Sequence, residues 1–183
     1  MLSLADRSSS TVIPTVQSAG LTVFHPSLAG NPHTAAVVLA AGRGLKTTAC
    51  FEKMLTLADA LQGQAVGTRG AVDMGWLPAS REVGLSGLRL APRLYFALGV
   101  SGANFHTIGM YRSKLIVAVN IEENARIFYM ADYCICAEAE TVLDGLLAAL
   151  PGRTFQGTDK IETFLLTQLQ AYPFRYNPVR KNE

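Results

Sequence analysis

The stretch LYFALGVSGANFHTIGM, Leu94–Met110, decides the fold. Its first part, Leu94–Gly99, is a continuous apolar run with the length of a buried strand. The small residues Val100–Ala103 then predict a turn, followed by a short helix to Met110. Glycines let a backbone approach a ligand closely, helix N-termini attract anions, and the Ser101 hydroxyl adds a donor. Without a G-x-G-x-x-G pattern, this segment alone fits a phosphate cradle and an ordinary strand-to-helix turn equally well.

Similar apolar runs recur through the central part of the chain, at Ala36–Ala40, Gln64–Thr68, Leu115–Asn120 and Tyr133–Ala137. Between them, Phe51–Leu61 and Thr141–Leu150 repeat apolar residues at intervals of three and four, which is typical of helices. Continuously apolar strands are covered on both faces. The sequence therefore predicts a doubly wound, mostly parallel sheet with helices on both faces, a Rossmann-like α/β fold.

We expect three parts: residues 1–34 as a linker or edge hairpin, residues 35–150 as the sheet domain, and residues 151–183 as a C-terminal tail with a candidate helix. Short strands are expected at Thr11–Val16 and Leu21–Phe24, and the tail helix at Lys160–Leu169. The long connection Trp76–Pro92 is of the kind that is usually functional or mobile.

Composition narrows the function classes. Only 16% of the residues are charged, the net charge is +2, and no stripe of lysine and arginine occurs, so nucleic-acid binding has little support. No apolar run reaches the roughly 20 residues of a membrane span, and the start MLSLADRSSS does not resemble a secretory signal. The cysteines Cys50, Cys134 and Cys136 suggest neither a disulfide framework nor a metal site, which favours a reducing cytoplasm.

Two arginines follow predicted strands beside glycines, Arg43 after Ala36–Ala40 and Arg69 after Gln64–Thr68. Ligands of open α/β sheets bind at the carboxyl ends of the strands, so both guanidinium groups could face an anion. Taken alone, Arg43 is better explained as a solvated loop arginine and His106 as a surface or core histidine, but two arginines at neighbouring strand ends strengthen the case for each other. We find no convincing Ser/His/Asp or Cys/His arrangement, which favours a binding or carrier role over hydrolysis.

Several longer motifs occur in a fixed order: AGRGLK (Ala41–Lys46), VGTRGAVDMGWLP (Val66–Pro78), VGLSG (Val83–Gly87), APRLYFALGVSGANFHTIGM (Ala91–Met110), SKLIVAVN (Ser113–Asn120) and ADY (Ala131–Tyr133). With them, the region from about Ala36 to Leu150 resembles the C-terminal, FAD-binding domain of electron transfer flavoprotein alpha subunits. The resemblance begins only at Ala36, so we expect the N-terminal α/β domain of that family to be absent.

The resemblance implies an extended FAD and a set of cofactor-contacting positions: Arg43, Thr68, Arg69, Val83, Gly84, Leu85, Ser86, Ser101, Gly102, Ala103, Asn104, Phe105, His106, Asn120 and Glu138. In the family's arrangement, Ser101–Asn104 hold the pyrophosphate, and Asn120 and Glu138 contact the adenosine half. Arg69 packs by the flavin ring, Ser86 lies near N5, and His106 lies near the pyrimidine edge. A cation such as Arg69, or a hydrogen-bond donor such as His106, would stabilise negative charge on the reduced flavin ring.

The sequence departs from the family at two positions that change the chemistry. Leu85 replaces a polar residue, and Phe105 replaces the usual glutamine. The exchanges at Thr68, Ser86 and Glu138 keep their chemistry.

Three hypotheses follow. The first is an FAD-binding electron carrier, not an enzyme, that forms a heterodimer with a beta-type subunit and passes electrons from dehydrogenases to an acceptor. The second is a redox-inactive nucleotide-binding or assembly module on the same fold. The third, less favoured, is an NAD-dependent enzyme. We also expect that a lone domain exposes an apolar patch and can self-associate.

Overall fold

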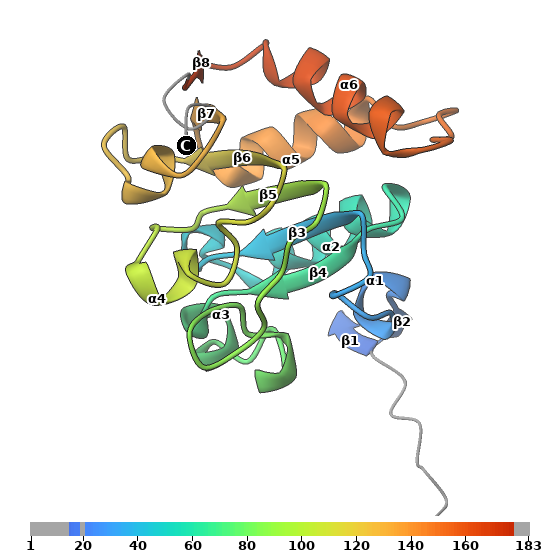
Figure 1. Ribbon diagram of the computed structural model, residues 1–183. Helices are drawn as coiled ribbons and strands as arrows, with labels where there is room; N and C mark the ends of the chain where they lie inside the picture. Colours follow the sequence, from blue (N-terminus) through green and yellow to red (C-terminus); the bar gives the residue numbers. More distant parts are fainter. Residues whose placement is uncertain (1–14, 19–20, 178–183) are drawn as a thin grey trace, which may run out of the picture.

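The computed structural model describes residues 15–18 and 21–177 and contains a six-stranded sheet (Figure 1). Its strands are, in chain order, β3 (Val37–Ala41), β4 (Gln64–Gly67), β5 (Leu94–Leu98), β6 (Leu115–Asn120), β7 (Tyr133–Cys136) and β8 (Phe174–Tyr176). Their spatial order is β4-β3-β5-β6-β7-β8, and all neighbours are parallel except β7 and β8. The predicted α/β class is therefore confirmed.

Both faces of the central strands are buried, as their apolar sequences predict. In β5, Leu94, Phe96 and Leu98 belong to the larger core cluster, while Tyr95 and Ala97 belong to a second cluster. Alternate residues of a strand point to opposite faces, so a strand without polar positions needs cover on both sides.

Long helices cover one face: α2 (Thr48–Ala60), α5 (Ala139–Ala148) and α6 (Thr158–Leu169). Helix α2 begins where the Thr47 hydroxyl accepts a hydrogen bond from the Cys50 N–H, and it packs against α5. The other face is covered by shorter pieces, namely α4 (Asn104–Thr107), the 3-10 helix η3 (Arg126–Tyr129) and the loop through Val83 and Leu90. Figure 1 shows α4 and these loops on the opposite side of the sheet from α2.

Three further short helices lie in the connections: η1 (Arg43–Leu45), α3 (Arg69–Asp73) and η2 (Ala79–Arg81). The predicted helix at Lys160–Leu169 falls within α6. Strand β8 was not predicted, because a three-residue edge strand has no period of its own and exists only by pairing with β7.

The segment before the sheet forms a separate antiparallel pair, β1 (Thr15–Ser18) and β2 (Leu21–Phe24), followed by α1 (Pro26–Ala29). Residues 11–14 of the strand predicted at Thr11–Val16 lie outside the described residues. Two side chains anchor α1. Asp59 of α2 accepts a hydrogen bond from the Ser27 N–H, and Arg81 of η2 donates to the carbonyls of Ser27 and Gly30.

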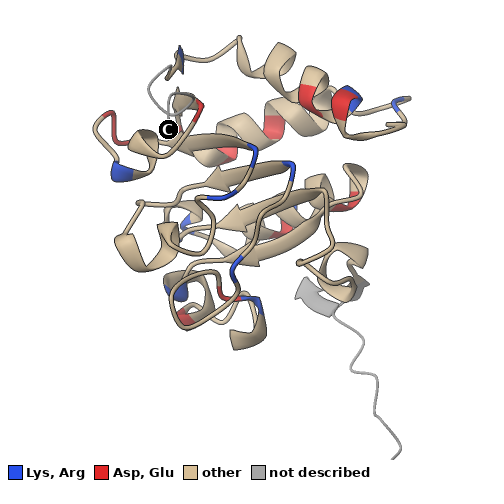
Figure 2. Cartoon of the chain, in the orientation of Figure 1, with Lys and Arg blue, Asp and Glu red and all other residues tan. Residues whose placement is uncertain are grey.

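Charged residues of both signs are scattered over the loops and helix surfaces (Figure 2). Within the described part of the chain, no helix has the length and apolar character needed to cross a membrane.

Candidate functional site

The strand order creates a crevice at the carboxyl edge of the sheet. The chain leaves β3 toward β4 on one side, and it leaves β5 toward β6 on the other. Loops that diverge in this way leave a gap between them, and doubly wound proteins bind ligands there. The crevice above β3 and β5 has a volume of about 570 Å3.

Glycines let the two diverging loops touch at the base of this crevice. A Cβ on Gly42 would lie 2.1 Å from the Gly99 carbonyl oxygen, and a Cβ on Gly99 would lie 2.6 Å from the Gly44 carbonyl carbon. Gly99 also has a φ of +63°, which favours glycine. The Gly42 N–H donates to the Leu98 carbonyl at 2.9 Å and the Gly44 N–H to the Gly99 carbonyl at 3.0 Å. Any larger residue would force these loops apart.

Most positions singled out from the sequence line the crevice: Arg43, Thr68, Arg69, Val83, Leu85, Ser86, Ser101, Ala103, Phe105, His106 and Asn120. Gly84, Gly102 and Asn104 are not in its lining, although they lie in the same turns. Gly102 instead packs against Ile127. Its φ is +84°, and a Cβ added to it would lie 2.1 Å from the Ile127 nitrogen.

The turn after β5 presents a row of unpaired backbone donors. The N–H groups of Ser101–Phe105 meet no acceptor among the residues that the structure describes. On either side of this turn, the Gly99 N–H donates to the Val119 carbonyl and the His106 N–H to the Ala103 carbonyl, each at 2.9 Å. Helix α4 has only four residues, so its macrodipole adds little. Successive free N–H groups are themselves an anion-binding arrangement.

The two arginines of the crevice differ in their partners. The Arg43 guanidinium has no hydrogen bond or ion pair to any described residue. Arg69 donates from Nε to Asp73 Oδ1 at 2.8 Å, and its Nη1 lies 3.9 Å from Glu82 Oε2. The hydrogen bond to Asp73, together with the charges of Asp73 and Glu82, raises the pKa of Arg69. Arg43 is therefore the cation available to a ligand anion, while the charge of Arg69 is largely offset.

His106 is buried and makes two hydrogen bonds within the protein. Its Nδ1 lies 3.0 Å from the Val83 carbonyl oxygen, and its Nε2 lies 3.1 Å from the Tyr95 hydroxyl. A carbonyl only accepts, so Nδ1 carries the proton and Nε2 accepts from Tyr95. Burial lowers the pKa of His106 to about 4, which keeps the ring neutral at pH 7. His106 thus supports the wall formed by Val83 and offers no free donor in this arrangement.

A smaller cavity of about 60 Å3 adjoins the crevice and shares Gly44, Gly99 and Asn120 with it. Glu138 lies in this second cavity and pairs with Lys46, with 2.6 Å between Oε1 and Nζ. Asn120 is buried and holds two turns, because its Nδ2 donates to the Val100 carbonyl at 2.8 Å and its Oδ1 accepts from the Glu122 N–H at 2.9 Å.

The two departures from the family pattern lie at the mouth of the crevice. Leu85 is 47% exposed and Phe105 is 70% exposed, and the Leu85 N–H donates to the Phe105 carbonyl at 2.7 Å. An apolar pair replaces polar side chains at this point.

Sequence reasoning missed five charged residues of the two cavities: Lys46, Asp73, Glu82, Glu122 and Glu140. The spacing of Asp73 from Arg69, four residues along a helix, was a usable signal. Glu82 lies in the long connection after β4 and reaches Arg69 only through tertiary structure, so no local pattern could have indicated it.

Fold and site together define a doubly wound α/β domain with a polar crevice at its topological switch point. Residues 32–111 match the family described as "Electron transfer flavoprotein FAD-binding domain". The resemblance found in the sequence motifs is therefore confirmed for this part of the chain.

Relatives from plants and bacteria share this region. The chain is 50% identical over 129 residues to "Electron transfer flavoprotein subunit alpha, mitochondrial" of Oryza sativa subsp. indica, covering 70% of this chain and 35% of the relative. It is 45% identical over 118 residues to "Electron transfer flavoprotein subunit alpha" of Mycobacterium tuberculosis, covering 64% and 37%. It is 47% identical over 105 residues to the Pseudomonas aeruginosa protein of that name, covering 57% and 34%. The chain thus spans about a third of the length of these curated relatives.

Proposed function

We propose that the crevice binds FAD and that the chain acts as an electron carrier of the electron transfer flavoprotein alpha type, not as an enzyme. The observation that carries the proposal is the row of free N–H groups at Ser101–Phe105, which lies at the switch point of a domain of this family. An FAD pyrophosphate is a double anion that such groups are suited to hold.

The residues present fit the parts of the cofactor. Ser101–Asn104 and Arg43 would hold the pyrophosphate, and Asn120 and Glu138 would face the adenosine half. Thr68, Arg69, Val83–Ser86, Phe105 and His106 would surround the flavin ring. The bound ring would supply reversible electron uptake, and the charges of Arg69, Asp73 and Glu82 would set how readily it accepts electrons.

A reductive titration tests the carrier role. Protein loaded with FAD should retain a visible chromophore that dithionite bleaches and that recovers when an electron acceptor is added. A protein that binds FAD but gives a chromophore unable to return its electrons would contradict the carrier role while leaving FAD binding intact.

Leu85 and Phe105 favour a second candidate function, a redox-inactive nucleotide-binding or assembly module. Their exposure puts apolar groups where a flavin ring would need polar partners. That function predicts tighter binding of ADP or AMP than of FMN, and no reducible chromophore. Comparing the affinities of ADP, FMN and FAD separates the two.

The proposal extends to partners and compartment. An electron transfer flavoprotein beta-type subunit would be the structural partner, with dehydrogenase and acceptor proteins as redox partners, and self-association would occur without them. The exposed Phe105, Ile108 and Tyr111 support a surface that packs on another chain.

The three free cysteines support a reducing compartment such as the cytoplasm.

A further inference from the structure

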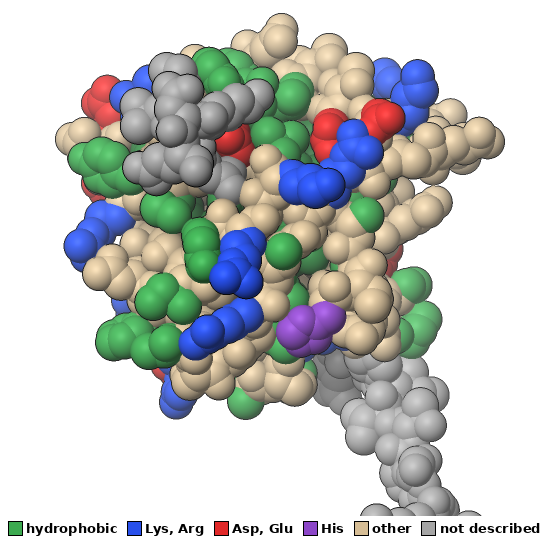
Figure 3. All heavy atoms as spheres, viewed as in Figure 1, with side chains coloured by type: hydrophobic (Ala, Val, Ile, Leu, Met, Phe, Trp, Pro, Cys, Tyr) green, Lys and Arg blue, Asp and Glu red, His purple; other side chains and the backbone are tan. Residues whose placement is uncertain are grey.

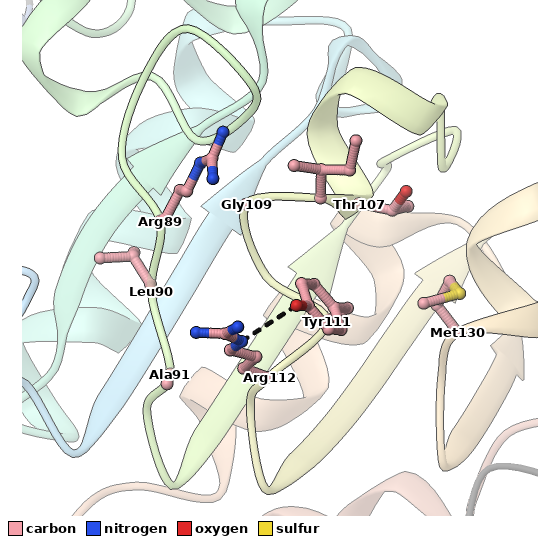
Figure 4. A pocket seen from close by; sticks show the side chains of 9 residues that line it. Arg89, Leu90, Ala91, Thr107, Gly109, Tyr111, Arg112 and Met130 are labelled. Atoms are coloured by element: carbon pink, nitrogen blue, oxygen red, sulfur yellow. Dashed lines mark hydrogen bonds between the residues drawn. The ribbon is translucent and has the colours of Figure 1, made fainter. Parts of the chain in front are cut away.

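A second large pocket lies away from the crevice, on the face covered by short helices and loops (Figure 4). Its volume is about 460 Å3. The segment before β5 forms one rim with Arg89, Leu90 and Ala91, and the connection from α4 to β6 forms the other with Ile108 and Tyr111 among its residues. None of the proposed cofactor contacts lines this pocket.

The charges of this pocket are all of one sign. Arg89 and Arg112 are its charged residues, and its lining contains no carboxylate. Arg89 has no hydrogen bond or ion pair to any residue in the described part of the chain, and Arg112 donates from Nε to the Tyr111 hydroxyl at 3.0 Å. The sequence from Val83 to Ile121 contains no aspartate or glutamate. An occupant of the pocket should therefore be anionic.

The rest of the pocket is apolar. Leu90 is buried beneath it, Met130 is partly exposed, and Ile108 and Tyr111 are 40% and 46% exposed. Figure 3 shows cationic side chains next to hydrophobic ones on this face of the molecule. A small inorganic anion would leave this apolar surface uncovered, so the fitting occupant combines carboxylates with an apolar side chain.

The backbone of the first rim distinguishes a peptide from a small molecule. The Leu88 N–H donates to the Glu82 carbonyl and the Leu90 N–H to the Gly109 carbonyl, each at 2.7 Å. The N–H groups of the exposed residues between and after them, Arg89 and Ala91, meet no acceptor among the described residues. This alternation is that of an edge strand, which pairs with an added extended chain.

We propose that this pocket docks an acidic peptide segment of a partner protein, which pairs with the Leu88–Ala91 edge and places one apolar side chain between Arg89 and Arg112. The inference is independent of the cofactor, because no residue of the pocket belongs to the proposed FAD site. The two sites nevertheless share a wall: a Cβ on Gly109 in the pocket would lie 2.5 Å from the nitrogen of Gly84, next to the crevice residue Val83. A docked peptide would thus lie directly behind that wall.

Fluorescence anisotropy of the full chain with a labelled peptide, one leucine between pairs of glutamates, tests the proposal. We expect saturable binding that weakens about ten-fold in Arg89→Gln and in Arg112→Gln, as for the loss of a charge-assisted hydrogen bond. Arg126→Gln, which changes an exposed arginine outside the pocket, should leave the affinity unchanged. The exposure of Arg89 and Arg112 lets both variants keep the fold.

Three changes in the peptide test which of its groups the pocket recognises. Binding should weaken when glutamine replaces the glutamates, when alanine replaces the leucine, and when alternate peptide nitrogens are methylated. An absence of saturable binding, or equal binding by Arg89→Gln and Arg126→Gln, would overturn the proposal. Displacement of the peptide by equal concentrations of citrate would also overturn it, because the pocket would then be a small-anion site. A dimer that Arg89→Gln dissociates would overturn it in favour of a second copy of this chain.

Discussion

At the scale of single residues, Arg69 and its two carboxylate neighbours set the charge on one side of the crevice. Asp73 bonds directly to the guanidinium, and the Glu82 side chain, 15% exposed, lies 3.9 Å from it. A cation close to a flavin stabilises the reduced, negatively charged ring, and nearby carboxylates oppose it. The sign of each effect can therefore be tested by removing one charge at a time.

Arg69→Ala should make the reduction potential of bound flavin more negative, because it leaves two carboxylates without their cation. Glu82→Gln should shift the potential in the positive direction, because it removes a carboxylate and keeps Arg69. Equilibration with a redox dye measures both potentials. Equal potentials in the wild type and the two variants would remove this group of residues from the tuning role.

His106 predicts a pH dependence of folding. Burial lowers its pKa to about 4, whereas in the unfolded chain the pKa is about 6.5. As the pH falls below 6.5, the unfolded state binds the proton first, so the stability present above that pH is lost down to pH 4. The loss from this residue reaches about 3 kcal/mol.

Urea unfolding at pH 7.5 and pH 5 measures the part of this loss that falls between those pH values, about 2 kcal/mol. His106→Gln should lose less stability between the two pH values than the wild type does. His33→Gln, which changes an exposed histidine, should behave as the wild type. An identical pH dependence in all three proteins would show that His106 is not the source.

At the scale of elements, the contact between the loops after β3 and β5 forms the base of the crevice. Gly99→Ala has two costs, because the backbone at this position has a φ of +63° and the added Cβ would collide with the backbone of Gly44. Gly152→Ala is a matched control, because Gly152 has a φ of +75° with nothing within 4 Å of an added Cβ. The control should lose about 1 kcal/mol of unfolding free energy, the cost of a left-handed backbone, and Gly99→Ala at least about 2 kcal/mol more. Equal losses in urea titrations would mean that the loops can separate freely.

The elements that sequence predicts well are those with a period of their own. Some elements carry enough apolar residues for their pattern to show whether one face or both are covered. These are the strands β3, β5 and β6 and the helices α2 and α5. The glycine turn after Leu98 also carries a local signal. Strand β8, the Arg69–Glu82 proximity and the pocket beneath Arg89 arise from contacts between distant segments, so no window of sequence contains them.

At the scale of the whole molecule, Arg81 joins three regions that are distant in sequence. It is buried, burial lowers its pKa, and it donates to the carbonyls of Ser27, Leu28, Gly30 and Ala65. Because Glu82 and Val83 follow directly, this anchor also fixes one wall of the crevice.

Arg81→Met should destabilise the protein by about 3 kcal/mol, since buried carbonyls lose their donor. It should also accelerate proteolysis in the segment around α1. Arg153→Met is the matched control, an exposed arginine that bonds one carbonyl, and should change stability by less than about 0.5 kcal/mol. An effect of Arg81→Met no larger than that of the control would mean that the other contacts of the N-terminal segment, Asp59 among them, hold it without Arg81.

The central claim is that the crevice at the switch point between β3 and β5 holds FAD. Its most direct test is the visible spectrum of the full chain after incubation with FAD and removal of free flavin by gel filtration. We predict retention of one FAD per chain with flavin absorbance, and its loss in Gly99→Ala. Colourless wild-type protein after gel filtration, or flavin retained equally by Gly99→Ala, would contradict the claim.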